Sequence, residues 1–227
     1  MEYKAEIDPA SYFPFWTALT ALQKDRVKNN ISRRFYPEGT LLHRGGEDCV
    51  GLFLVESGRL RIYTISESGK EMTLYRLLDR DICLLSASCM LKGIQFDVMV
   101  SAEADTRVLV VAPSVYKPLM EESPAVANFT NLLMASHFSE VMWRMEQIQS
   151  KKLDSQLAAL LLEERILQGT DKLTVTHAML GNHLGSPREV ITRLLKFLQA
   201  EGLVSLERGS ITLIDPAGLE RLAEESL

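Results

Sequence analysis

The feature that most constrains this chain is a pair of short helical segments separated by a single glycine. The sequence "HAMLGNHL" (177–184) precedes Gly185, and "SPREVITRLLKFLQAE" follows it. Ser186 has the side chain of a helix N-cap, Pro187 suits the first helical position, and Glu189 follows Ser186 by three residues, as in a capping box. Two short helices joined by a glycine-containing turn are typical of a helix-turn-helix.

The second of these helices has one apolar face and one polar face. The apolar residues predicted to point inward are Val190, Leu194, Leu195 and Leu198. The residues predicted to point outward are Arg188, Glu189, Thr192, Arg193 and Lys196. Arginine can donate two hydrogen bonds to guanine, glutamate can accept one from cytosine, threonine can contact the thymine methyl group, and lysine suits a phosphate. This face predicts contacts to the DNA major groove, although Glu189 and Arg193 also have the spacing of a surface ion pair.

The charge balance limits how the chain could bind nucleic acid. The formal net charge is −5, and the segment 151–227 holds nine Lys and Arg against eleven Asp and Glu. Binding through a general positive field is therefore not expected, and the polar helix face would have to bind a specific site as one half of a dimer. A winged helix used only for protein contacts would more often present aromatic or apolar anchors on this face.

No segment suggests export or insertion into a membrane. The N-terminal "MEYKAEIDPA" has no basic flank followed by an apolar run, and nowhere do about 18 apolar residues follow one another. The three cysteines form no CxxC pair, so a disulfide framework is not indicated. We expect a cytoplasmic protein with no membrane partner.

Short strands and tight turns are expected in the first half of the chain. Turn signals occur at Gly39, Gly45, Gly46, Gly58 and Gly69. Between two of them, Leu60, Ile62 and Thr64 alternate with Arg59, Arg61 and Tyr63. Further strands are predicted at "QFDVMVSAEA" and "TRVLVVAP". The spacing of the turns predicts a small antiparallel barrel or sandwich.

One long helix is predicted from Pro124 to about Ile148, where the sequence contains no glycine and no further proline. Its apolar residues form two stripes, Val126, Phe129 and Leu133 in one and Met134, Phe138, Val141, Met145 and Ile148 in the other. One stripe would suffice for packing on the same domain, so two stripes favour pairing with a second subunit over burial in a monomer. The predicted dimer residues are Val126, Phe129, Leu133, Phe138, Val141 and Met145.

The polar segment "QSKKLDS" (149–155) is predicted to be a hinge between two domains. The first domain, 1–150, holds the strands and the long helix of about 124–150. The second domain, 151–227, holds the helix-turn-helix. It is expected to end in a hairpin that turns at Arg208-Gly209 and a short helix after Pro216.

Three stretches resemble one family of bacterial regulators, the catabolite-activator and fumarate-nitrate (Crp/Fnr) family. "LGSPREVITRLLKFLQAEGLV" looks like its recognition helix, "ESGRLRIYTISESGKEMTLYRLL" resembles strands of its β-roll, and "GSITLIDPAGLERL" resembles its wing and last helix. The resemblance implies an α+β fold with an N-terminal cyclic-nucleotide-binding-like β-roll (a double-stranded β-helix), a long dimerisation helix and a C-terminal winged helix-turn-helix. It also implies a homodimeric transcriptional regulator that binds a pseudo-palindromic operator in double-stranded DNA and works with RNA polymerase.

The family's base-contacting positions carry over to individual residues. Arg188, Glu189 and Arg193 match those of the catabolite-activator type. Glu189, Thr192 and Arg193 match those of the fumarate-nitrate type, which often has Ser in place of this Thr. Because both patterns are present, we expect a guanine-containing half-site and do not choose between the two consensus types. The full predicted DNA-binding set is Ser186, Arg188, Glu189, Thr192, Arg193 and Lys196.

The family's cyclic-AMP site is altered in this chain. Members that bind cyclic AMP carry a Glu for the ribose and an Arg-Ser pair for the phosphate, but the matching positions hold Leu85, Phe96 and Asp97. A phosphate would meet an apolar ring and a negative charge instead of a guanidinium, so cyclic AMP is not expected. We predict an unidentified, small and partly apolar effector in a pocket lined by Leu85, Ser86, Phe96, Cys83 and Cys89.

The sequence leaves other sensor chemistries open. Iron–sulfur members use four cysteines, most of them near the N-terminus, whereas this chain has Cys49, Cys83 and Cys89, so that cluster is not expected. Cys83 and Cys89 could form a redox-active pair or a metal site completed by His43, or could simply be small buried hydrophobes. A haem held by His43 and His137 is a further alternative. A cupin-like metalloenzyme would need two or three barrel histidines, and only His43 is there, so we do not expect an enzyme.

Overall fold

The computed structural model describes residues 8–45, 50–84 and 98–225. The chain divides into two compact units, each defined by its internal contacts. The first, here called the β-roll unit, consists of 1–64 and 74–140, and the second, called the winged unit, consists of 65–73 and 141–227. The segment 65–73 therefore belongs by its contacts to the winged unit, although it joins two strands of a β-roll sheet.

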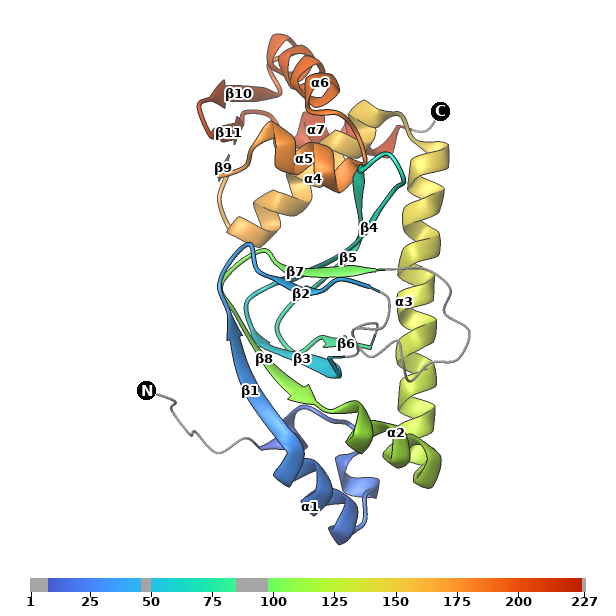
Figure 1. Ribbon diagram of the computed structural model, residues 1–227. Coiled ribbons are helices and arrows are strands. Elements are labelled where there is room, and N and C mark those ends of the chain that lie inside the picture. The colour runs from blue at the N-terminus through green and yellow to red at the C-terminus, as the bar shows by residue number, and fades with distance from the viewer. Residues whose placement is uncertain (1–7, 46–49, 85–97, 226–227) are drawn as a thin grey trace. The chain divides into compact units, whose positions relative to one another are not determined.

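Two four-stranded sheets form the β-roll in the described ranges (Figure 1). The first has the order β1-β8-β3-β6, with β1 (Ile31–Tyr36), β8 (Thr106–Val111), β3 (Leu52–Ser57) and β6 (Ile82–Cys83). The second has the order β2-β7-β4-β5, with β2 (Leu41–His43), β7 (Met99–Ala102), β4 (Leu60–Ile65) and β5 (Glu71–Leu77). The central strand β8 pairs antiparallel with both β1 and β3. The expected β-roll is confirmed.

The core of the β-roll unit lies beneath its short helices. Two 3₁₀ turns (Pro9–Ser11 and Trp16–Ala18) precede α1 (Ala21–Asn30), and α2 (Pro113–Glu122) follows β8 directly. A capping box of Thr20 and Gln23 starts α1. The largest fully buried side chains of this cluster include Phe13, Leu52, Leu54, Leu109, Tyr116 and Leu119. Phe15 and Phe129, which are far apart in the sequence, meet here with ring centroids 5.1 Å apart, so the core forms only when the whole unit folds.

The long helix α3 (Pro124–Ser150) is continuous, as the sequence predicts. Its first stripe packs on the chain's own core, because Val126 is fully buried there and Phe129 and Leu133 pack against the same cluster. The prediction that Val126 contacts a second subunit is therefore wrong. Other apolar side chains of α3 remain exposed, namely Leu132, Phe138, Met142, Trp143, Met145 and Ile148, while Val141 is half-buried. No helix in the described ranges, α3 included, is both long and apolar enough to cross a membrane.

The winged unit contains the predicted helices and hairpin. Its elements are α4 (Leu153–Gln168), β9 (Lys172–Leu173), α5 (His177–Leu184), α6 (Arg188–Ala200), β10 (Val204–Glu207), β11 (Ser210–Leu213) and α7 (Pro216–Glu224). Glu207 pairs with Ser210, so the hairpin turns at Arg208-Gly209 as expected, and β9 adds a third strand. Apolar faces of α4, α5 and α6 meet in one core that includes Leu157, Leu161, Leu180, Ile191 and Leu195.

Candidate nucleic-acid interface

A tight turn sets the angle between α5 and α6. Gly185 has a φ of +64°, in the left-handed region that ends α5, and the Ser186 N–H donates to the Gly181 carbonyl at 2.9 Å. Gly181 is equally constrained, because a Cβ there would lie 2.6 Å from the Ser186 carbonyl oxygen. The predicted helix-turn-helix is confirmed. The sequence pointed to Gly185 but not to Gly181, since a glycine inside a helical pattern does not reveal which backbone approaches it.

Replacing Gly181 with Ala is expected to destabilise the winged unit, even though alanine favours a helix. The helical preference of Ala over Gly is about 1 kcal/mol, whereas overpacking costs about 1–3 kcal/mol. The overlapping atom is a backbone oxygen of the turn itself, so it has little room to move. We expect the urea midpoint of unfolding to fall, and a midpoint at or above that of the wild type would refute the steric argument.

The helix α6 begins one residue later than the sequence predicts. Pro187 is the N-cap residue, with a ψ of 144°, and no side chain caps this end. The predicted capping box of Ser186 and Glu189 is therefore wrong. The reason is local, because the Ser186 N–H already closes α5 and the chain enters the helical conformation only at Arg188. The Glu189 carboxylate consequently has no capping role and is exposed.

The outer face of α6 has the predicted polar composition. Arg188, Glu189, Arg193 and Lys196 are exposed, and Thr192 is half-buried. Across the described ranges no ion pair joins Glu189 to Arg193, so the simple surface-pair explanation of these two residues does not apply. The fully buried residues are Ile191, Leu195 and Leu198, whereas Val190 and Leu194, also predicted to point inward, are only partly buried.

The Thr192 hydroxyl is occupied by contacts within the helix-turn-helix. It donates to the Arg188 carbonyl at 2.8 Å and lies 2.9 Å from Nδ1 of His177, the first residue of α5. Thr192 therefore links α6 to α5 through its hydroxyl oxygen. Burial, and then the positive charge of Arg188, lower the pKa of His177 from its ordinary value. No local pattern in the sequence predicts this contact between His177 and Thr192.

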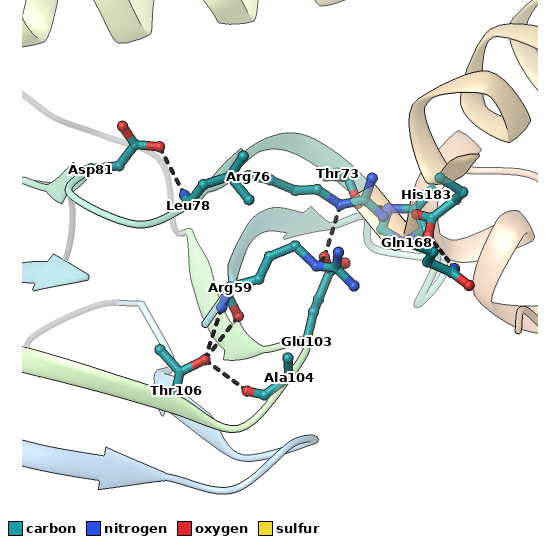
Figure 2. A network of polar contacts seen from close by, with 11 residues as sticks. Arg59, Thr73, Arg76, Leu78, Asp81, Glu103, Ala104, Thr106, Gln168 and His183 are labelled. Atoms are coloured by element: carbon teal, nitrogen blue, oxygen red, sulfur yellow. Dashed lines mark hydrogen bonds and ion pairs between the residues drawn. The ribbon is translucent and has the colours of Figure 1, made fainter. Parts of the chain in front are cut away.

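The end of α5 also contacts the segment 65–73. Figure 2 shows Thr73 beside His183, with the Thr73 Oγ1 at 2.7 Å from the His183 Nδ1 and both side chains almost fully buried. Met72 packs on the turn, since a Cβ on Gly185 would lie 3.6 Å from the Met72 Cβ. Thr73 and His183 are 110 positions apart in the sequence. The position of the α5–α6 turn thus depends on a hairpin that the sequence suggested was only part of the β-roll.

Replacing Thr73 with Val is expected to cost about 1–3 kcal/mol of stability, the usual cost of removing one member of a buried hydrogen-bonded pair. The shape of the side chain is preserved, so packing against His183 changes little. The measurement is the urea midpoint of unfolding of the purified protein. The matched control is Thr174→Val at an exposed position, which should stay within about 0.5 kcal/mol. Equal midpoints for the two variants would show that the contact contributes nothing.

A second polar cluster ties strands of the β-roll unit together (Figure 2). The Glu103 Oε2 lies 3.0 Å from the Arg59 Nε and 2.8 Å from the Arg76 Nε. Thr106 accepts from the Arg59 backbone N–H at 3.1 Å and donates to the Ala104 carbonyl at 2.7 Å. One carboxylate therefore holds β4, β5 and the end of β7 in register.

Most of the predicted effector pocket lies outside the described residues. This applies to Leu85, Ser86, Cys89 and Phe96. Cys83, the described member, is fully buried in β6. The described ranges contain no group of three or more His, Cys, Asp and Glu side chains arranged to hold a metal ion.

His137 is held by the protein through a ring face and both ring nitrogens. Its ring stacks on Tyr75 with centroids 4.6 Å apart and an interplanar angle of 8°. Its Nε2 lies 3.2 Å from the Ile82 carbonyl oxygen, and its Nδ1 lies 3.3 Å from Glu140. Coordination of a haem iron by His137 would require breaking one of these contacts. His43, the other histidine considered for haem, is buried in β2.

Family comparisons match both units of the chain. A model of the cyclic nucleotide-binding domain matches residues 33–123, and a model of the Crp-like helix-turn-helix domain matches residues 155–222. A solved structure of a transcriptional regulator of the Crp/Fnr family from Eubacterium rectale is 50% identical. It superposes with a TM-score of 0.93 over 95% of this chain and 100% of that one.

Curated relatives of similar length are more distant in sequence. The cyclic AMP receptor protein of Thermus thermophilus is 28% identical over 211 residues, which cover 92% of this chain and 96% of the relative. The fumarate and nitrate reduction regulatory protein of Escherichia coli is 26% identical over 210 residues, which cover 88% and 82%. Both named types of regulator are therefore similar to this chain along most of its length, and no enzyme is among these relatives.

Proposed function

Because the chain belongs to the Crp/Fnr family of transcriptional regulators, we propose that it binds a pseudo-palindromic DNA operator as a homodimer under the control of a small effector other than cyclic AMP. The observation that carries this proposal is the outer face of α6. Arg188, Glu189 and Arg193 are exposed there on a helix whose other face is locked into the core. A rigid helix that presents such side chains suits the major groove.

Each exposed side chain has a distinct part in this proposal. Arg188 and Arg193 can each donate two hydrogen bonds to a guanine, and Glu189 can accept one from a cytosine. Lys196 lies about one turn beyond Arg193 and suits a phosphate. Thr192 would contact a thymine through its methyl group, because its hydroxyl already bonds within the protein. Ser186, in the turn before α6, would contact the DNA backbone.

The exposed apolar residues of α3 support the homodimer. Ala135, Phe138, Met142 and Met145 are exposed and follow one another at steps of three, four and three residues. That spacing is the heptad pattern of helices that pair in parallel. Phe138 is 66% exposed and Met142 is 47% exposed, which leaves large apolar side chains in water unless a second copy covers them. We therefore place the dimer contact on this stripe, which retains Phe138 and Met145 from the sequence prediction.

The proposal of an effector other than cyclic AMP rests on the sequence. Leu85, Phe96 and Asp97 stand where cyclic-AMP-binding members have their ribose and phosphate ligands. The effector would act by changing the orientation of the two winged units, through the break between α3 and α4 at Lys151-Lys152. Two half-sites about one helical turn apart can be bound together only when both α6 helices are correctly placed. As an activator or a repressor, the dimer would then act on RNA polymerase.

Fluorescence anisotropy on double-stranded fragments of the gene's own promoter region tests the proposal. The titrations are run at two salt concentrations, with and without cyclic AMP and with and without reductant. We expect one palindromic fragment to bind preferentially at both salt concentrations, with no effect of cyclic AMP. Enhancement by cyclic AMP would disprove the effector assignment, and a reductant effect would favour the thiol alternative. Equal binding of all fragments would disprove specific recognition.

A further inference from the structure

His177 and Thr192 join the two helices of the helix-turn-helix beside the face that we assign to DNA. The Nδ1 of His177 lies 2.9 Å from the Thr192 hydroxyl oxygen. Thr192 has one hydroxyl proton and donates it to the Arg188 carbonyl at 2.8 Å. The oxygen can therefore only accept from His177, so Nδ1 carries a proton. In the neutral ring, the lone pair is then on Nε2.

The second ring nitrogen of His177, Nε2, is available to a ligand in the part of the chain that the structure describes. Within the described ranges, no protein group bonds to Nε2, and the ring is partly exposed. Burial, and then the positive charge of Arg188 on α6, lower the pKa of His177. The free protein at neutral pH thus presents an unprotonated nitrogen next to the exposed Arg188.

We propose that operator binding takes up one proton on Nε2 of His177, which turns this residue into a cationic phosphate contact. The inference rests on the proposed DNA-binding function. In a helix-turn-helix the first helix crosses the sugar–phosphate backbone, and His177 begins that helix. A phosphate there would offset the charge of Arg188 and accept a charge-assisted hydrogen bond from the protonated Nε2. The bond from Nδ1 to Thr192 is the same in both protonation states, so the change requires no rearrangement of α5 against α6.

The direction of the pH effect follows from proton linkage. The pKa of His177 is lowered in the free protein, and a bound phosphate would raise it. Between the two pKa values the complex holds one proton more than the free protein, so affinity rises as the pH falls through that window. The limiting slope for one proton is about tenfold in Kd per pH unit. Outside the window both states carry the same charge, and the dependence disappears.

Anisotropy titrations of the full-length protein on the palindromic fragment, from pH 5.5 to 8.0 at constant ionic strength, test the inference. We expect the wild-type Kd to fall about threefold to tenfold as the pH is lowered, through uptake of up to one proton. His177→Asn keeps an N–H donor near the position of Nδ1 but cannot become charged, and His177→Gln places an uncharged N–H near the position of Nε2. Both variants should bind specifically at pH 8.0 and lose the pH dependence.

The outcomes separate this inference from the function on which it rests. A wild-type affinity that is specific but independent of pH would overturn the proton uptake and leave the DNA-binding function intact. A pH dependence that persists in both His177→Asn and His177→Gln would assign the proton to another group and overturn the inference equally. Loss of preference for the palindromic fragment at every pH would instead overturn the proposed function itself.

Discussion

Phe138→Asp is expected to yield a folded protein that no longer dimerises at micromolar concentration. Phe138 is 66% exposed, so the substitution removes no contact on which the core of its own chain depends. Burial of one such ring contributes about 1.5–3 kcal/mol, and two are lost per dimer. Association should therefore weaken roughly 100-fold or more. Sedimentation-velocity ultracentrifugation over a concentration series measures this directly, and operator affinity should fall with it because each monomer can fill only one half-site.

Two comparison variants separate the dimer contact from general damage to α3. Ser136→Asp places the same charge on an exposed part of this helix, away from the Ala135–Met145 stripe, and should leave the dimer intact. Leu133→Asp replaces a side chain that packs on the chain's own core. Its main expected effect is therefore a lower urea midpoint of unfolding and not a weaker dimer. A wild-type dimer for Phe138→Asp together with a weakened dimer for Leu133→Asp would reverse our assignment of the two faces.

The two faces of α3 show which part of the fold could be predicted from the sequence and which part could not. The two stripes predicted that the helix meets two surfaces, and the structure confirms one of them, the core of the chain's own β-roll unit. Periodicity alone gave no means of deciding which stripe faced which surface, and Val126 was assigned to the wrong one. That decision depends on the core formed by α1, α2 and strands β3 and β8, which come together from distant parts of the sequence. Local patterns contain no information about such contacts.

In the helix-turn-helix, the overall pattern could be predicted from the sequence, but individual hydrogen bonds could not. The helix-turn-helix and its exposed charges followed from the order of residues, since helix periodicity and a turn glycine are local properties. The predicted capping role of Ser186 is wrong, and the contact between Thr192 and His177 has no local signal in the sequence. Ser186 is drawn into the turn that ends α5, and the hydroxyl of Thr192 is taken up by His177, fifteen residues earlier. Both outcomes depend on how the two helices are joined.

Arg193→Ala is expected to cost about 1–3 kcal/mol of binding free energy at the specific operator and much less on random DNA. Arg193 is exposed on α6, and no ion pair to Glu189 holds it to the protein surface in the described ranges, so its loss should not affect folding. The measurement is the Kd on the palindromic fragment and on a scrambled fragment of the same length and charge. Replacing the guanine that Arg193 is proposed to contact should cost the wild type about as much as the mutation does, and should cost the variant little.

Lys196→Ala provides the matched control on the same helix face, because a phosphate contact adds affinity without selecting a sequence. It should weaken binding to both fragments alike and reduce the slope of log Kd against log salt by about one. If Arg193→Ala also weakened both fragments equally, Arg193 would be a phosphate contact, and specificity would have to come from Arg188 and Glu189. The ratio of the affinities for the palindromic and the scrambled fragment therefore decides the role of Arg193. The operator affinity alone cannot decide it, because loss of a base contact and loss of a phosphate contact would both lower that affinity.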